Sequence, residues 1–208
     1  MAAILRPGTA PATVGVPGLL RRLLPKLWQS FPRAAVRVRL DGGFASPAIF
    51  DLLEDAGVEY VVAMATNAVL LTEAAPSLAQ ARTVADASAQ SARVFADTSY
   101  QAKTWRQARR VIIKAEVVAH PGRELRDNPR FLVTNLRHTP ETVYDHIYAA
   151  RGDSENRIRS LTTIILLSLR QTAIPRRLGV VAHWFLTSES ASRTLMNACL
   201  VTPSRRAS

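Results

Sequence analysis

The sequence has little cysteine, no long apolar run and, over its first forty positions, no acidic side chain. Its single cysteine, Cys199, excludes an intrachain disulfide, and no group of Cys and His has the spacing of a structural zinc site. The two longest apolar runs, 161–169 and 178–186, are about half the ~20 residues that a spanning helix needs. We therefore expect no disulfide, no zinc finger and no membrane span, and a reducing compartment.

The charge is unevenly distributed along the chain. Residues 1–40 contain seven Arg or Lys and no Asp or Glu, and residues 151–208 are also strongly basic, whereas the middle is nearly balanced. A formal net charge of +11 attracts polyanions, of which nucleic acid is the usual one. A nucleic-acid partner is the favoured interpretation, and a solvated basic surface is the alternative. An organelle transit peptide is a weaker interpretation of the first residues, because prolines interrupt them repeatedly.

The first hundred residues predict an α/β fold in one domain, since 208 residues with 48% hydrophobic content support a single core. Apolar spacing predicts a helix over 18–30, and alternation predicts a strand over 35–40. Ser46-Pro47 has the pattern of a helix cap and a first-turn proline, and opens a helix to Ala56, followed by a strand over 58–63. Strand, helix and strand form a βαβ unit with two parallel strands.

The second half of the pattern predicts one more helix, a group of strands and a last helix. An alanine-rich helix is expected over 66–90, beginning near Asn67 and resuming after Pro76. Strands over 93–96, 109–118 and 131–135 predict an antiparallel insertion or an extension of the sheet. Thr139-Pro140 predicts a cap and a first-turn proline for a helix through Arg159, with an interruption near Gly152.

Two places in the chain carry candidate chemistry. Asp41 follows a strand directly, and in open α/β sheets ligands bind outside the carboxyl ends of the strands. Tyr148, Arg151 and Glu155 are spaced so that a continuous helix places them on one face. If this helix packs beside the strand end, Asp41 and Glu155 meet and hold a divalent cation through oxygen ligands. Alternatively, Asp41 only makes a turn, and Glu155 is a solvated residue that pairs with a nearby arginine.

Two ordered motifs resemble the insertion-sequence DDE transposases of the group called transposase DDE domain group 1. The first is Val38-Arg-Leu-Asp-Gly-Gly-Phe44, preceded by Leu5-Arg-Pro-Gly8 and followed by Gly57-Val-Glu-Tyr-Val-Val62 and Asn67-Ala-Val-Leu70. The second, Tyr148-x2-Arg151-x3-Glu155, is similar to the family signature Tyr-x2-Arg-x3-Glu-x6-Lys. The resemblance extends from about residue 4 to residue 159.

The resemblance implies a ribonuclease H-like fold and Mg²⁺-dependent phosphoryl transfer on transposon-end DNA. It makes Asp41 and Glu155 the second and third catalytic, metal-binding carboxylates, and it makes Tyr148 and Arg151 DNA-binding residues. The strands over about 93–136 correspond to the β-rich insertion ahead of the Glu-bearing helix. Within them, Trp105, Arg106, Arg109 and Arg110 are expected either to touch DNA or to form a hairpin with a packed tryptophan. A cytoplasmic, nucleoid-associated bacterial protein follows, and an oligomer is left open.

The chain departs from the family pattern in two places. The first catalytic Asp belongs upstream of the region that matches Leu5, and residues 1–40 contain no acid. We therefore expect residues 1–159 to be a partial catalytic core, truncated at its N-terminus, with weak Mg²⁺ binding and no cleavage. Thr162 stands where the signature has Lys. Residues 160–208 are expected to be a divergent basic tail translated from another frame, or alternatively a genuine C-terminal helix with His183 in its core.

Two other functions compete with the inactive transposase core. The first is a basic nucleic-acid-binding protein without catalysis. The second is an active ribonuclease H-like nuclease in which Asp51, Asp97 or Asp153 replaces the missing carboxylate. Asp153 is the poorest of these three, since on a helix it faces away from Glu155.

Overall fold

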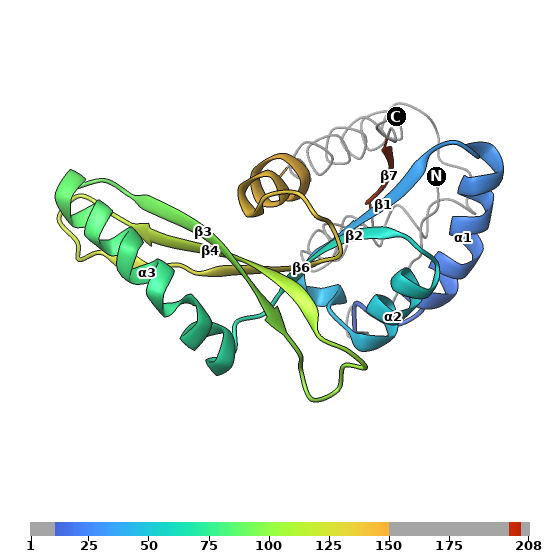
Figure 1. Ribbon diagram of the computed structural model, residues 1–208, viewed down its shortest axis with the longest axis horizontal. Helices are drawn as coiled ribbons and strands as arrows, with labels where there is room; N and C mark the ends of the chain where they lie inside the picture. Colours follow the sequence, from blue (N-terminus) through green and yellow to red (C-terminus); the bar gives the residue numbers. More distant parts are fainter. Residues whose placement is uncertain (1–10, 150–199, 205–208) are drawn as a thin grey trace, which may run out of the picture.

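The structure is a computed structural model that describes residues 11–149 and 200–204. It is elongated, with α1 and α2 at one end and α3 beside the strands β3 and β4 at the other (Figure 1). α1 spans Val16–Ser30 and contains Pro25, whose side chain lies on the exposed face of the helix. The expected α/β class is confirmed for this part of the chain.

The βαβ unit predicted from the sequence is present. β1 (Ala35–Leu40) is followed by α2 (Pro47–Asp55) and β2 (Glu59–Met64), and the two strands are parallel. Ser46 occupies the cap position with extended backbone, as its position before Pro47 predicted, but its side chain makes no capping hydrogen bond. Pro47 itself supplies the helical backbone angle and needs no donor, which is sufficient to start the helix.

The remaining strands extend the same sheet rather than forming a separate unit. They are β3 (Ala92–Tyr100), β4 (Arg109–Val118), β5 (Arg126–Asp127), β6 (Arg130–Thr134) and β7 (Leu200–Ser204). Six strands follow the order β3-β4-β6-β2-β1-β7, and the short β5 pairs with β4. β6 is antiparallel to β2, with Met64 opposite Phe131. Of the two forms that the sequence left open, the structure shows a sheet extension, and the sheet is mixed.

α3 is one continuous helix over Ala68–Ser88, where the sequence predicted a break at Pro76. Its start is as predicted, because the Asn67 side chain accepts a hydrogen bond from the backbone N of Leu70 at 3.0 Å. Pro76 lies on the exposed side of the helix, while Leu70, Ala74, Ala81 and Ala85 are buried. Burial of the small residues against β3 and β4 holds the helix together through the proline, as tertiary packing does when it overrides local propensity.

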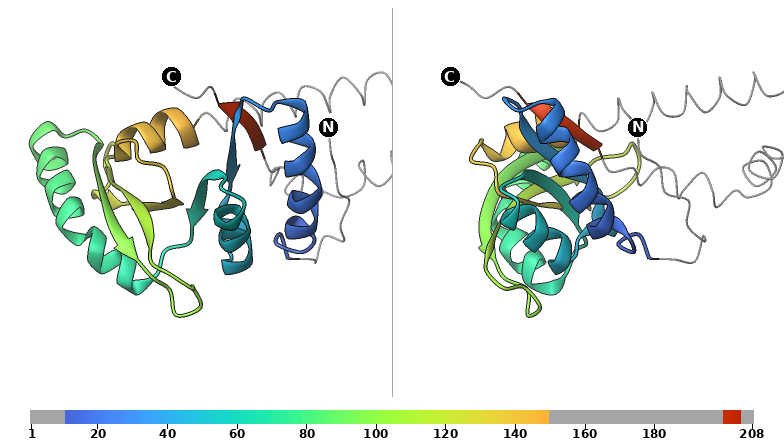
Figure 2. Two further views of the ribbon diagram at one scale, coloured as in Figure 1. Left: turned by 45° about the vertical axis from the view of Figure 1, so that its right-hand side comes forward. Right: turned by 90° about the vertical axis from the view of Figure 1, so that its right-hand side faces the viewer.

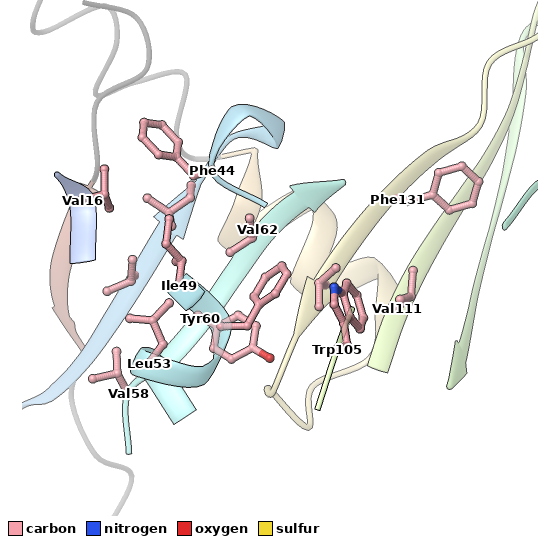
Figure 3. Packing of buried hydrophobic residues seen from close by; sticks show 14 of the residues in the cluster. Val16, Phe44, Ile49, Leu53, Val58, Tyr60, Val62, Trp105, Val111 and Phe131 are labelled. Carbon is pink, nitrogen blue, oxygen red and sulfur yellow. The ribbon is translucent and has the colours of Figure 1, made fainter. Parts of the chain in front are cut away.

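The strand alternation divides the core between the two faces of the sheet. One face buries Val36, Val38 and Leu40 of β1 together with residues of α1 and α2, as Figure 3 shows for part of this cluster. The opposite face buries Val61 of β2 together with Val143 and Ile147 of the helical segment η2 (Thr142–Tyr148). Figure 2 shows η2 on a different side of the strands from α3. The odd-numbered residues of β1 therefore face η2.

Candidate metal and DNA site

Asp41 lies where β1 ends, at the edge where the carboxyl ends of the parallel strands meet. Its Oδ1 accepts a hydrogen bond from the backbone N of Gly43 at 3.0 Å and so caps the single 3-10 turn η1, Gly42–Phe44. The backbone of Asp41 is extended, with φ −83° and ψ 178°. Phe44 closes the turn with a buried ring. Asp41 therefore makes a turn and also occupies the strand-end position, and its role as a metal ligand stays a prediction.

The helix expected from Thr139 begins as predicted. Oγ1 of Thr139 accepts a long hydrogen bond from the backbone N of Thr142, at 3.4 Å, and the carbonyl of Thr139 accepts one from Val143 at 3.0 Å. From Thr142 to Tyr148 the backbone forms a π-helix, η2, in which Ala149 N donates to Tyr144 O at 2.8 Å. Helical segments of this kind are rare and occur frequently at functional sites.

The π-helix changes what can be inferred about the signature residues. The spacing argument for Tyr148, Arg151 and Glu155 assumed a continuous α-helix, and the described segment that leads to Tyr148 has a longer repeat. Arg151 and Glu155 lie outside the described residues. The meeting of Glu155 with Asp41 is therefore still a prediction, and so is the DNA-binding role of Tyr148 and Arg151.

Side chains of the sheet fix η2 in place. Tyr144 and Tyr148 belong to η2, and their ring centroids are 5.9 Å apart. Both side chains pack beside the apolar cluster around Val61. The ammonium of Lys114 lies 5.2 Å from the centroid of the Tyr144 ring, and Arg93 forms an ion pair of 2.9 Å with Asp145. Burial, followed by the neighbouring Tyr148, raises the pKa of Tyr144.

Arg39 is a residue of this site that sequence reasoning missed. It belongs to β1, two positions before Asp41, and it is buried with 7% of its surface exposed. Its Nη1 donates a hydrogen bond of 2.9 Å to the carbonyl of Ile147. The sequence carried a signal for the orientation of Arg39 but not for its partner, because the alternation of Val36, Val38 and Leu40 places Arg39 on the opposite face of the strand.

The acids that the sequence offered as a substitute for the first catalytic carboxylate are paired with arginines where the structure describes them. Asp51 lies 2.6 Å from Nη2 of Arg109, and Asp97 lies 2.6 Å from Nε of Arg110. Asp153 lies outside the described residues. Within 11–149 and 200–204, no group of three or more His, Cys, Asp or Glu side chains is placed to hold a metal ion. The described residues thus contribute Asp41 alone to the expected ligand set.

Trp105, which precedes β4, and Arg109, its first residue, are packed into the fold. Trp105 is buried against Phe50 and Tyr100, with ring centroids 5.2 and 5.4 Å away. Arg109 lies with its guanidinium carbon 5.1 Å from the Phe50 ring centroid and 5.0 Å from that of Trp105. Trp105 is packed, as one of the two interpretations of this segment expected, and Arg109 belongs to an internal ion pair. Contact of Arg106 or Arg110 with DNA stays a prediction.

The carboxylate partner of Arg109 is Glu54, which has a shifted pKa. Burial alone would raise the pKa of Glu54, but hydrogen bonds from Arg109, Tyr60 and Gln107 outweigh it and leave the pKa below its usual value. Burial, and then the hydrogen bond to Glu54, raise the pKa of Tyr60. Tyr60 therefore stays protonated and donates to Glu54 at 2.7 Å.

Comparison with known proteins places this arrangement in a class. The family model described as "Transposase DDE domain group 1" matches residues 1–174, and the chain belongs to this family. The match continues beyond residue 159, where the sequence resemblance was expected to end. No curated protein and no solved structure matches the chain. Transposases of the DDE class act on DNA and use divalent metal ions. None of the described helices is long and apolar enough to cross a membrane.

Proposed function

We propose that this chain is part of a DDE transposase catalytic core that acts on transposon-end DNA, and that it does not cleave DNA by itself. The observation that carries the proposal is the position of Asp41 at the carboxyl end of β1, in a chain that matches the family over residues 1–174. The parallel β1–β2 pair and the helix on the face of Arg39 are consistent with a partial ribonuclease H-like fold. In this proposal residues 1–159 form the core.

Asp41 and Glu155 are the proposed ligands of a divalent cation. Carboxylate oxygens are the donors that Mg²⁺ prefers, and the hydrogen bond from Gly43 N holds the Asp41 carboxylate at the end of β1. A bound Mg²⁺ would supply Lewis-acid stabilisation of the phosphoryl group. Gly43 orients the Asp41 carboxylate, and Arg39 and Lys114 hold the helix segment that precedes Glu155.

Arg151 and Tyr148 are the proposed contacts to DNA. A guanidinium forks onto phosphate oxygens and stays charged at every physiological pH, which suits Arg151 to the backbone of the transposon end. Tyr148 is half-buried on η2, next to Ile147, and it directly precedes the segment that contains Arg151. The excess of basic residues in 1–40 and 151–208 adds sequence-independent attraction to the same polyanion.

The proposal that the chain does not cleave DNA depends on the missing carboxylate. Residues 1–40 contain no Asp or Glu, and both Asp51 and Asp97 are occupied by arginines. A two-metal site that lacks a carboxylate ligand binds its cations weakly, so strand cleavage should be absent.

The test is a titration with Mn²⁺, monitored by electron paramagnetic resonance, of the parent chain and of Asp41→Asn and Asp55→Asn. Asp55→Asn is the matched control because Asp55 is exposed on α2. We expect weak binding in the parent and in the control, loss of binding in Asp41→Asn, and no nicking of supercoiled DNA by any variant. Binding that survives Asp41→Asn would refute the metal site. Metal-dependent nicking that Asp41→Asn abolishes would refute the claim of inactivity.

A basic nucleic-acid-binding protein without catalysis is the second candidate. The observation that favours it is the charge pattern: acids of the middle segment, such as Asp51, Asp97 and Asp127, are paired with arginines, whereas the surplus basic residues lie towards the two ends. Such a protein would bind duplex DNA with a steep salt dependence and without preference for inverted-repeat ends. Competition between terminal-repeat and scrambled duplexes at fixed salt separates the two functions. Either protein would be expected on the bacterial nucleoid.

A further inference from the structure

Arg39 connects the two elements on which the proposed site depends. β1 ends at Asp41, and η2 leads directly towards Arg151 and Glu155. Arg39 lies on the face of β1 turned towards η2, and the extended backbone of Asp41 continues the alternation of the strand by one more residue. The side chain of Arg39 is thus on the side of the sheet where the proposed ligands would meet.

The contact from Arg39 to Ile147 is short, buried and charged. Nη1 donates to the carbonyl of Ile147 at 2.9 Å, between residues that are 108 positions apart in the chain. Hydrogen bonds from an ionised donor are roughly twice as strong as neutral ones, and a low local dielectric strengthens them further. The rigid planar guanidinium also fixes direction as well as distance. Ile147 immediately precedes Tyr148, so this bond places the Tyr148 backbone relative to β1.

The other anchors of η2 come from different strands. Arg93 of β3 pairs with Asp145 at 2.9 Å, and Lys114 of β4 lies over the Tyr144 ring. These contacts fix the helix against the sheet extension. The bond from Arg39 fixes η2 against the strand that ends at Asp41, and the sharing of one cation by Asp41 and Glu155 would depend on this separation.

We propose that Arg39 is a positioning residue that sets the separation between Asp41 and the helix carrying Tyr148, acting through the carbonyl of Ile147. The consequence for metal and DNA binding rests on the proposed function. The effect of Arg39 on the separation of β1 and η2 does not depend on that function, because it involves only these two segments.

The experiment measures the distance between two nitroxide labels by pulsed electron paramagnetic resonance. The labels are attached at Ala48→Cys, exposed on α2 just after the Asp41 turn, and at His146→Cys, exposed on η2, in a Cys199→Ser background. Arg39→Met keeps an unbranched apolar stem but removes the donors, and Arg39→Lys keeps the charge and an ammonium donor. The matched control is Arg22→Met, which removes an exposed arginine that bonds only Gly18 of its own helix among the hydrogen bonds described.

We expect one narrow distance distribution in the parent and in Arg22→Met, a broad or displaced one in Arg39→Met, and an intermediate one in Arg39→Lys. Circular dichroism establishes that each variant is folded. A distribution in folded Arg39→Met that matches the parent overturns the proposal. If Arg39→Met does not fold, Arg39→Lys decides: a broadened distribution supports the proposal, and one that matches the parent overturns it.

A second readout separates this proposal from the proposed function. Loss of an outer partner of a metal site typically lowers metal affinity by 10-fold or more, so we expect roughly 10-fold weaker Mn²⁺ binding in Arg39→Met and none of this loss in Arg22→Met. If the parent itself binds no Mn²⁺, the proposed function fails, and the label distances still decide the role of Arg39.

Discussion

Arg109 and Glu54 form a bidentate ion pair that joins β4 to α2. Nε lies 2.7 Å from Oε1, and Nη2 lies 2.9 Å from Oε2. The Arg109 side chain is 2% exposed and that of Glu54 is 14% exposed, so the pair is shielded from water. Phe50 and Trp105 lie against the guanidinium and complete its surroundings. This pair fixes the sheet extension to the βαβ unit.

Removing Arg109 should therefore destabilise the whole fold. Arg109→Met leaves the carboxylates of Glu54 and Asp51 without their buried partner, and we expect a loss of about 3–5 kcal/mol in the free energy of unfolding, measured by urea denaturation. Arg106→Met is the control, because Arg106 and Asp55 are 57% and 64% exposed. We expect no measurable change in the control, and equal losses in the two variants would contradict the assigned role of Arg109.

The depressed pKa of Glu54 predicts that stability falls in acid. Because the folded-state pKa lies below the ordinary value of 4.5, the unfolded chain binds more protons in this range, and stability rises with pH there. The contribution of Glu54 is complete above about pH 4.5 and is lost as the pH falls through the folded-state pKa. Urea denaturation at several pH values from about 3 to about 6, the range in which carboxyl groups ordinarily titrate, measures this slope.

Glu54→Gln should flatten that dependence. The amide keeps the shape of the side chain but does not titrate, so the variant should be less stable than the parent near neutral pH and should lose less stability on acidification. The same acid slope in parent and variant would show that other carboxylates, such as Glu116, whose pKa is also lowered, control the transition.

Replacement of Pro76 by alanine should stabilise α3. A proline inside a helix removes one hydrogen-bond donor and clashes with the preceding turn, at a cost of about 3 kcal/mol, while it also restricts the unfolded chain by about 0.4–1 kcal/mol. We expect Pro76→Ala to raise the free energy of unfolding by roughly 1–2 kcal/mol. This is somewhat less than the difference between the two terms, because local relaxation of the helix around Pro76 already lowers the cost of the proline. Thermal unfolding followed by circular dichroism measures it.

Pro47→Ala is the matched control for this substitution. Pro47 stands at the first position of α2, where no donor is needed and the fixed backbone angle is favourable. The control should be neutral or slightly destabilising. A gain in stability at position 47 as large as that at 76 would contradict the explanation given for α3.

Two substitutions of Asp41 should separate the structural role of this residue from its chemical role. Asp41→Asn keeps an acceptor for the N–H of Gly43, whereas Asp41→Ala removes it along with the charge. We expect Asp41→Ala to lose about 0.5–2 kcal/mol of stability, as for a lost helix cap, and Asp41→Asn to lose much less. Both should lose Mn²⁺ binding. Equal stability in the two variants, measured by urea denaturation, would show that the turn does not depend on this hydrogen bond.

Much of the fold could be predicted from local patterns. Alternation placed β1 and β4 at their observed bounds, and Ser46-Pro47 gave the start of α2. The continuity of α3 through Pro76 could not be predicted, because it depends on the packing of Ala81 and Ala85 against a strand that lies far along the chain. The π-helical turn of η2 likewise has no local sequence signal in an amphipathic segment.

Only those parts of the site that follow from a residue's place in the sequence could be predicted. A strand followed by an acid and two glycines identified the edge occupied by Asp41. The contact between Arg39 and Ile147 spans the chain, and the pairing of Asp51 and Asp97 with arginines depends on which strands become neighbours. A one-dimensional pattern contains none of this information.

The antiparallel pairing of β2 with β6, called the seam below, has a consequence for how the molecule folds. β1, α2 and β2 are close in sequence, and β3 and β4 form a hairpin, so each unit can assemble after a short chain closure. The seam joins residue 64 to residue 131, so it closes a much longer loop. We therefore expect the seam to form late, and substitutions in it to accelerate unfolding more than they slow folding.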